Sequence, residues 1–286
     1  MTKKSKNIND GTNITTIKNE SNIDSDKKAE IIQDKVGQLY KKINFLEKIT
    51  QYFFYINLLI VLSFIFHIQF KNWFILLHIC FSIIYNVLSK YIDLYLKNNV
   101  ETEHRKTFIK NALNANITEN NSTNNYYNNS EKESIKKMGL NCFESLLFSE
   151  FIANKMIREE FLKTTGLVLI FISLVISTHN LLDFTLLISQ AFLSLEKLYL
   201  FIKLLYFKNH VTVLYSDIYS LFVTSRPKND QVLIAKILDI TMNYECLKYF
   251  CKISLSSRIF NKYNSALSKE WDDIYHKKIE GTNANQ

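Results

Sequence analysis

Two histidines flank a short polar turn in the first half of the chain and have the donor chemistry to bind a metal ion or relay a proton. His67 and His78 lie on either side of Lys71-Asn72 within the otherwise apolar stretch FHIQFKNWFILLHIC. If two helices meet at this turn, the histidines lie about 6 Å and about 9 Å below it and face each other. A metal site needs three or four ligands, and His179 is the only obvious third. Interfacial histidines are therefore the favoured interpretation.

Polar side chains also recur at helical spacing inside the apolar segments. His78, Ser82 and Asn86 follow one another every four residues and so share one helix face. A similar stripe runs along the fourth apolar segment as far as Lys197. Such groups either form polar contacts between helices or line a water path once subunits assemble, and both interpretations stay open. The candidate residues are Asn57, His78, Ser82, Asn86, Ser173, Ser177, Asp183, Gln190 and Ser194.

The chain carries no pattern typical of an enzyme or of a metal or cofactor site. It contains no nucleophile elbow, P-loop, HExxH motif or paired carboxylates. Its 4 cysteines show no CxxC or Cys/His spacing, so neither a disulfide scaffold nor a zinc site is expected. The acidic cluster around Trp271 is interpreted as a solvated helix face with the indole packing inward. We therefore expect no enzyme activity, no metal and no cofactor.

Long helices must position the candidate residues. Only 5 Gly and 1 Pro among 286 residues leave few turn formers, which disfavours a sheet. Residues 49–70 and 72–89 contain 22 and 18 residues without a charge, and each can cross, or nearly cross, a hydrocarbon core of about 30 Å. As one helix they would run about 60 Å, twice what a bilayer needs. A hairpin that turns at Lys71-Asn72, with Trp73 in an interfacial aromatic belt, is therefore predicted.

A second apolar pair follows at about residues 164–182 and 183–203. The first of these has 19 uncharged residues. The second holds Asp183 near one end. At its other end we expect Lys197 or Lys203 to snorkel toward the headgroups. It is the weakest span, and a shallow or tilted helix is the alternative. The predicted fold is all-α: a multi-pass membrane protein with two helical transmembrane hairpins and cytoplasmic helical extensions.

Polar segments surround the two hairpins. Residues 1–28 have no aromatic residue and no helical stripe, so they are predicted to be a disordered tail and not a signal peptide. Residues 29–110 comprise an amphipathic helix and the first hairpin. Residues 111–130 form an Asn-rich loop, which is too polar to fold alone. A helix and the second hairpin occupy 131–208, and a cytoplasmic helical region occupies 209–286.

The distribution of charge predicts the orientation. With four spans, residues 1–48, 90–163 and 197–286 share one side and hold 10, 11 and 13 Lys+Arg, which leaves Lys71 alone of the 35 for the opposite side. The positive-inside rule then places both termini in the cytosol, although part of this skew arises because these segments are also most of the polar chain. The net charge of +8 is explained by the cytosolic face and lipid headgroups, and no nucleic-acid-binding motif accompanies it.

Three stretches carry a resemblance to a known family. They are IIQDKVGQLYKKINFLEK (31–48), ESLLFSEFIANKMIREEF (144–161) and the helical end through EWDDIY. In layout they resemble the prokaryotic four-transmembrane, SMODS-associated pore-forming effectors and their two-span SLATT relatives. Few residues are identical, and the Asn-rich insert departs from the pattern. The resemblance implies an effector that permeabilises the membrane of infected cells, with an upstream nucleotide-signalling protein as a candidate partner.

Two classes of function remain open from the sequence. The first is a homo-oligomeric, pore-forming or membrane-perturbing effector of the bacterial inner membrane. The second is a non-conducting scaffold whose hairpins anchor or shape an endomembrane, as reticulon-like proteins do. The lipid bilayer is a partner in both classes, and nucleic acid is a partner in neither.

Overall fold

The computed structural model describes residues 35–66, 71–119, 127–177 and 181–280, and within these ranges every regular element is a helix. The all-α class is therefore confirmed. The predicted tail at 1–28 lies outside the described residues. The α-helices are α2 (Lys35–Phe66), α3 (Lys71–Tyr91), α4 (Lys97–Leu113), α5 (Ile135–Ser177), α6 (Leu181–Tyr219), α7 (Asp230–Cys251) and α8 (Ser257–Asp272); the π-helical turns are η1 (Ile92–Leu96), η2 (Ser220–Thr224) and η3 (Asp273–Glu280).

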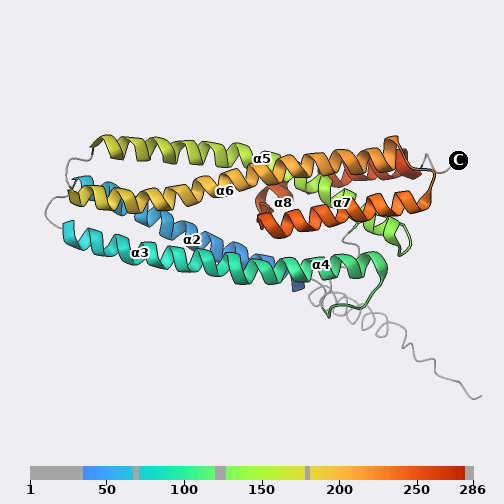
Figure 1. Ribbon diagram of the computed structural model, residues 1–286, viewed down its shortest axis with the longest axis horizontal. Coiled ribbons are helices and arrows are strands. Elements are labelled where there is room, and N and C mark those ends of the chain that lie inside the picture. Colours follow the sequence, from blue (N-terminus) through green and yellow to red (C-terminus); the bar gives the residue numbers. More distant parts are fainter. Residues whose placement is uncertain (1–34, 67–70, 120–126, 178–180, 281–286) are drawn as a thin grey trace, which may run out of the picture.

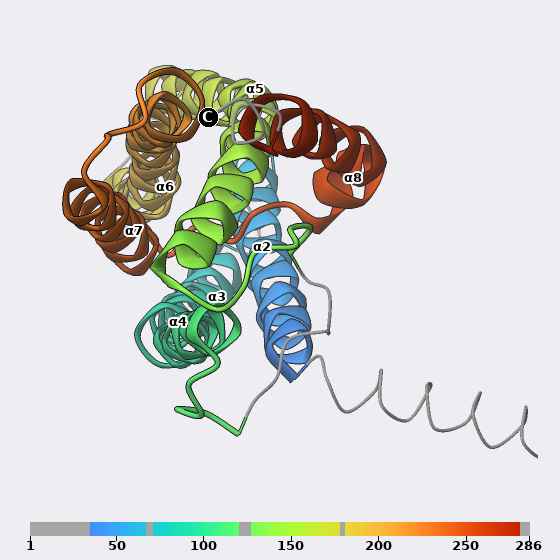
Figure 2. The ribbon, with the colours of Figure 1, turned by 90° about the vertical axis from the view of Figure 1, so that its right-hand side faces the viewer.

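Long rods give the molecule its shape (Figure 1). Helix α5 has 43 residues and α6 has 39, so α5 runs for about 65 Å at helical rise, roughly twice the thickness of a hydrocarbon core. Turn η1 joins α3 to α4 without a break, which makes a third rod. At the left of Figure 1, α2 and α3 lie beside the end of α5 and the start of α6. Helices α7 and α8 lie toward the right, beside the other halves of α5 and α6. The view along the rods shows α8 on the far side of α5 from α7 (Figure 2).

Short polar side chains mark where helices α7 and α8 begin. The side chain of Asn229 accepts a hydrogen bond from the Gln231 N–H at the start of α7, and the Ser256 hydroxyl accepts one from the Ile259 N–H at the start of α8. These contacts satisfy backbone donors that lack a partner in the first helical turn. Helix α4 ends at Asn114, which adopts the left-handed conformation with φ 52°.

The largest core cluster lies among the halves of the rods that carry α7 and α8. It joins side chains of α4, α5, α6, α7 and the continuous α8–η3 helix. Phe143 lies at its centre, with ring centroids 5.7 Å from Tyr215, 6.2 Å from Phe222 and 5.3 Å from Trp271. Trp271 is fully buried, as the inward-packing interpretation of its helix predicts.

The described ends of the Asn-rich segment are anchored to this core. Helix α4 extends to Leu113, three residues into the range expected to be loop. The Trp271 Nε1–H donates to the carbonyl of Asn128 at 2.7 Å, and the Ser130 N–H donates to the Tyr275 hydroxyl at 3.2 Å. Ala112 and Tyr127 also pack in or against this core, so both described ends of the segment are fixed by it.

Two helical stretches are long and apolar enough to cross a membrane, Val36–Ser63 and Asn72–Leu113. Only 28% and 22% of their most apolar windows are buried in the protein. The core helix of a water-soluble protein would bury most of such a window, because exposed apolar surface is unfavourable in water. The first hairpin therefore has the length and the outward-facing apolar surface of a membrane hairpin.

Two glycines of α5 offer a matched test of packing at the helix crossing. A Cβ at Gly139 would lie 2.9 Å from both Ile237 Cγ2 and Phe222 Cζ, whereas a Cβ at Gly166 would meet nothing within 4 Å. We expect Gly139→Ala to lower the free energy of unfolding by about 1–3 kcal/mol, because the core must move apart. Gly166→Ala should leave it unchanged or raise it slightly. Thermal unfolding of the purified chain in detergent measures both, and equal effects would show that α5 does not pack this closely.

Candidate functional site

A single apolar layer joins all the rods at the level of the first hairpin. Phe54 of α2, Tyr85 of α3, Leu167 of α5 and Leu193 of α6 are buried together in one cluster. The Phe54 and Tyr85 ring centroids lie 6.0 Å apart. The two helix pairs therefore form one four-helix unit at this level, and any polar group just beyond the layer lies inside a protein interior.

Polar side chains occupy the interior on the tip side of this layer. Asn57 lies one turn from Phe54, and Ser82 lies one turn from Tyr85. The Ser82 hydroxyl donates to Asn57 Oδ1 at 3.5 Å. Gln190 lies one turn from Leu193 in the same direction, and Asn57, Ser82 and Gln190 are all buried. The structure thus brings these three predicted residues to one level, and we call Asn57, Ser82, Gln190 and the neighbouring Ser194 the polar row.

Four other predicted residues, Asn86, Ser173, Ser177 and Asp183, lie away from the polar row or have side chains that the structure does not describe. Asn86 is exposed and its Nδ2 donates to the Ser82 carbonyl at 2.9 Å; Ser173 is exposed and its hydroxyl donates to the Ile170 carbonyl at 2.7 Å. Steps of four residues drift by about 40° each around a helix, so two steps carry Asn86 away from the face of His78. His78 is itself fully buried. The side chains of Ser177 and Asp183 lie outside the described residues, as do His67 and His179.

Several atoms of the polar row have no hydrogen-bond partner among the described residues. These are Asn57 Nδ2, both amide atoms of Gln190, and Ser194 Oγ. Asn57 is 0% exposed and Gln190 is 1% exposed. Buried polar groups are nearly always paired, because an unmade hydrogen bond in an apolar surrounding costs about 1–3 kcal/mol. A row of such groups inside the bundle is therefore a feature that calls for a function.

Lys197 points into the bundle. Its Nζ lies 5.0 Å from the ring centroid of Phe54 and 5.6 Å from that of Tyr85. Either Lys197 or Lys203 was expected to snorkel toward the headgroups. Lys197 lies over these two inner rings, and Lys203 lies over the exposed ring of Tyr199, at 5.9 Å. The faces of two aromatic rings attract an ammonium group, which offsets part of its loss of water. A positive charge thus lies against the apolar layer.

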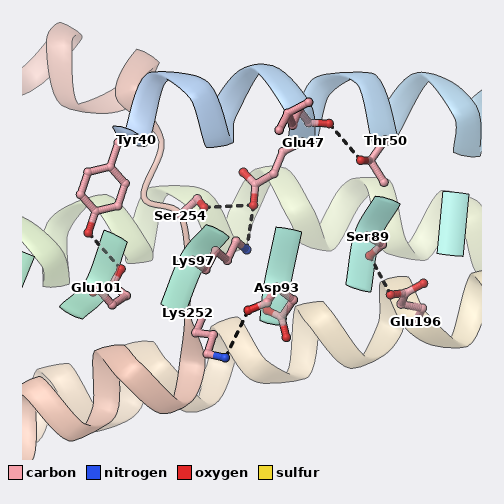
Figure 3. Close-up of polar contacts among 11 residues, drawn as sticks. Tyr40, Glu47, Thr50, Ser89, Asp93, Lys97, Glu101, Glu196, Lys252 and Ser254 are labelled. Atoms are coloured by element: carbon pink, nitrogen blue, oxygen red, sulfur yellow. Dashed lines mark hydrogen bonds and ion pairs between the residues drawn. The ribbon is translucent and has the colours of Figure 1, made fainter. Parts of the chain in front are cut away.

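A band of polar contacts follows on the side of the layer that carries α7 and α8 (Figure 3). Glu196 of α6 accepts hydrogen bonds from Ser89 and Lys90 of α3, both at 3.1 Å. Glu47 of α2 pairs with Lys97 of α4 at 2.7 Å and accepts from Ser254 at 3.0 Å. The Glu196 contacts join the two helix pairs where the apolar segments end, and the Glu47 contacts join α2 to α4 and to the segment between α7 and α8.

The same band ties the segment between α7 and α8 to the first hairpin. Lys252, the left-handed residue that ends α7, donates to the carbonyl of Asp93 at 3.2 Å. Asp93 lies in the π-helical turn η1. Such turns interrupt the regular α-helical hydrogen bonding and are frequent at functional sites. The segment between α7 and α8 therefore contacts the α3–α4 rod at the π-helical turn η1.

A second cluster of titratable groups lies farther from the apolar layer, between α4 and α7. The Lys248 ammonium lies 3.3 Å from His104 Nδ1 and pairs with Glu245 at 2.6 Å. Burial, and then the nearby Lys248, hold the pKa of His104 well below its usual value. Burial raises the pKa of Glu101, while Lys248 and the hydrogen bond from the Tyr40 hydroxyl oppose that shift. A neutral imidazole can accept a hydrogen bond from the ammonium, so this cluster is internally consistent and structural.

Sequence reasoning missed Lys197 as an inward group, and it missed Glu144. Burial, which is the main cause, raises the pKa of Glu144 to about 7, with a smaller contribution from Asp272; the Asn128 N–H, which donates to this carboxylate at 3.0 Å, acts in the opposite direction. The spacing that aligns Gln190, Ser194 and Lys197 on one face was a usable signal for the lysine. No local pattern marks Glu144, because its burial depends on the chain returning from the Asn-rich segment.

The chain matches no known protein family, no curated protein and no solved structure. The functional conclusion therefore depends on the geometry above and on the distribution of apolar and charged residues.

The raised pKa of Glu144 predicts a pH dependence of stability. The folded state binds a proton that the unfolded state releases between the ordinary carboxyl pKa and about 7, so the stabilising contribution is complete at low pH and is lost as the pH rises toward 7. We expect Glu144→Gln to remove this decline and to raise the free energy of unfolding by up to about 3 kcal/mol at about pH 8. Thermal unfolding at about pH 5 and about pH 8 measures it.

Glu160→Gln is the control for this prediction, because Glu160 is partly exposed and paired with Lys163 on the helix surface. Exposed pairs contribute about 0–1 kcal/mol, so this variant should retain the pH dependence of the unaltered chain. If Glu144→Gln also retains it, the carboxyl of Glu144 is not the group that titrates.

Proposed function

We propose that the chain is an integral membrane protein with four spans and cytoplasmic termini that assembles with copies of itself and permeabilises the membrane when its cytoplasmic helices receive a signal. The polar row enclosed at the level of the apolar hairpin is the observation that carries this proposal. Asn57 and Gln190 are buried there with amide groups that no described residue satisfies. Polar residues at bilayer depth are unfavourable in hydrocarbon and commonly mark pathways for ions or substrates.

Outward-facing apolar side chains support spans in α5 and α6 as well as in α2 and α3. Leu169 is 62% exposed, and Ile176 and Phe192 are also exposed. Leu169 and Ile176 follow Leu167 along α5, and Phe192 precedes Leu193 along α6. Leu167 and Leu193 belong to the apolar layer. Because that layer also includes the first hairpin, a bilayer around α2 and α3 would surround these side chains too.

Aromatic and charged residues support the orientation. Exposed tyrosines cluster near the cytoplasmic band, and Trp73 is exposed near the opposite tip, as expected of residues at membrane interfaces. Of the 35 Lys+Arg, 34 belong to the side that carries the cytoplasmic helices. The four tyrosines near the band are Tyr91, Tyr95, Tyr199 and Tyr206, and Tyr52, Tyr55 and Tyr249 are exposed as well.

The packing of the two hairpins favours an effector over a membrane-shaping scaffold. Hairpins that only wedge into a leaflet have no need to pack on each other or to enclose amides. Here one residue from each rod meets in the apolar layer, and Asn57 and Gln190 lie just beyond it.

The family resemblance gives this proposal a biological setting. An effector of this layout would lie in the bacterial inner membrane and would act in an anti-phage or conflict response. An upstream protein that makes a nucleotide signal is the partner that the resemblance implies. The cytoplasmic helices α7 and α8 are the part of this chain available to such a signal.

Labelling of cysteines tests the four-span topology. Cys246 of α7 is exposed, so in the weakly leaking background Asn57→Leu and Gln190→Leu an impermeant maleimide should label it only after the cells are opened with detergent. With Cys80 and Cys246 replaced by Ser, a cysteine introduced at Trp73 or at Ser177 should be labelled in intact cells, because both positions lie at the far ends of spans. Labelling at Trp73 but not at Ser177 would show that the second hairpin does not cross.

Leakage of the membrane tests the permeabilising activity. Induced expression in bacteria should admit a membrane-impermeant dye and collapse a potential-sensitive probe. The double variant Asn57→Leu and Gln190→Leu should reduce leakage by about tenfold or more, because two amides of the polar row are replaced by apolar groups. Asn86→Leu, on the exposed face of α3, is the matched control and should leak as before.

Membrane insertion of each variant is measured in the same cells by fractionation. A chain that inserts but causes no leakage, also with nucleotide signals supplied, would overturn the effector proposal and leave the scaffold. Equal leakage from the double variant and the unaltered chain would show that the polar row is not the pathway.

A further inference from the structure

The unpaired groups of the polar row are mainly hydrogen-bond donors. Asn57 uses its Oδ1 to accept from Ser82, which leaves the Nδ2 donor without a partner among the described residues. The Nε2 of Gln190 and the hydroxyl of Ser194 are in the same position. Three N–H or O–H groups in a buried row, with no carboxylate in the row, suit a ligand that accepts hydrogen bonds.

Lys197 adds a positive charge to these donors. Gln190, Ser194 and Lys197 follow steps of four and three residues, so they share a face of α6 within about 10 Å of helix length. The Lys197 Nζ contacts the rings of Phe54 and Tyr85, which lie one turn from Asn57 and Ser82 respectively. The ammonium group and the amides therefore approach the same part of the interior from two sides of the apolar layer.

Glu196, Glu160 and Glu47 lie near enough to attract the Lys197 ammonium group, but each makes its close contacts with other groups. Glu196 contacts Ser89 and Lys90, Glu47 contacts Lys97 and Ser254, and Glu160 contacts Lys163. Within the described residues Lys197 makes no ion pair, and its close neighbours are the two aromatic rings. A cation with this surrounding keeps an attraction for an anion, since a low-dielectric interior screens charge less than water does.

We propose that Asn57, Gln190, Ser194 and Lys197 bind a small anion such as chloride, and that the species which crosses the membrane through this unit is an anion. The second half of the proposal rests on the permeabilising function proposed above. Amide N–H, hydroxyl and ammonium groups replace the water around the anion, while a cation would meet an ammonium group at the layer. Lys197 is thus the residue that sets the sign of the charge selected.

The experiment compares Lys197→Gln with Lys203→Gln in the full chain. Lys203 lies on the same helix but over the exposed Tyr199 ring, so its loss removes one charge without altering the row. Purified chains are unfolded thermally in sodium chloride and in sodium gluconate, and are also reconstituted into planar bilayers with a potassium chloride gradient. Chloride should raise the unfolding temperature of the unaltered chain and of Lys203→Gln, and this shift should vanish in Lys197→Gln.

In the bilayer, the permeability ratio of chloride to potassium should exceed one for the unaltered chain and fall about tenfold in Lys197→Gln, a change of about 1.4 kcal/mol in relative free energy. Lys197→Arg keeps the charge and should retain both chloride stabilisation and anion preference. Ser194→Ala, a small change that leaves the fold intact, should weaken chloride stabilisation without abolishing it.

The outcomes separate the anion site from the permeabilising function. No chloride stabilisation of the unaltered chain, or an equal loss in Lys203→Gln, overturns the anion site. Conductance that prefers potassium overturns anion permeation and leaves the proposed function standing. Chloride stabilisation that depends on Lys197, in a chain that never conducts, upholds the anion site and refutes permeabilisation.

Discussion

Phe54, Tyr85, Leu167 and Leu193 meet in one apolar layer, and each comes from a different rod. This contact is what makes two hairpins into one unit. The polar row is interior only because the layer draws the rods together, and Lys197 can lie over two rings only because those rings are held there. Side chains on the opposite faces of the same helices are forced outward, where they form the apolar surface that a bilayer requires.

Helices α5 and α6 pass from this layer into the large core around Phe143 without a break. Glu47 and Glu196 cross-link neighbouring rods where the apolar segments end. Lys252 adds the link from the α7–α8 segment to the α3–α4 rod. A displacement of α7 and α8 would therefore be transmitted to the apolar layer through packed, continuous helices. Connections of this kind couple distant regions of a protein.

Much of the helical layout was predictable because it follows from local composition. Long uncharged stretches bounded by charge, and the scarcity of Gly and Pro, predict the helix pair α2 and α3. The turn was predicted at Lys71-Asn72, but both residues belong to the first turn of α3. The inward position of Trp271 was predictable from the amphipathic pattern of its own helix. Asn57 and Gln190 were recognisable as candidates because amides are rare in apolar segments.

Other features depend on contacts between distant parts of the chain, and local pattern does not encode them. Lys197 turns inward because aromatic rings from two other rods lie beside it. Glu144 is buried because Asn128 returns from the Asn-rich segment to cover it. Asn86 was grouped with His78 by simple spacing, although the drift of the helix carries it to the exposed side.

The π-helical turn η1 has a consequence for the rotational setting of the α3–α4 rod. A turn of this kind accommodates one residue more than an α-helical turn, and one residue corresponds to about 100° of rotation. The azimuth that α3 presents to the apolar layer is therefore set separately from the azimuth that α4 presents to the cytoplasmic core. One uninterrupted rod thus packs against two different surroundings, the apolar layer and the large core, whose demands on a single helical phase would otherwise conflict.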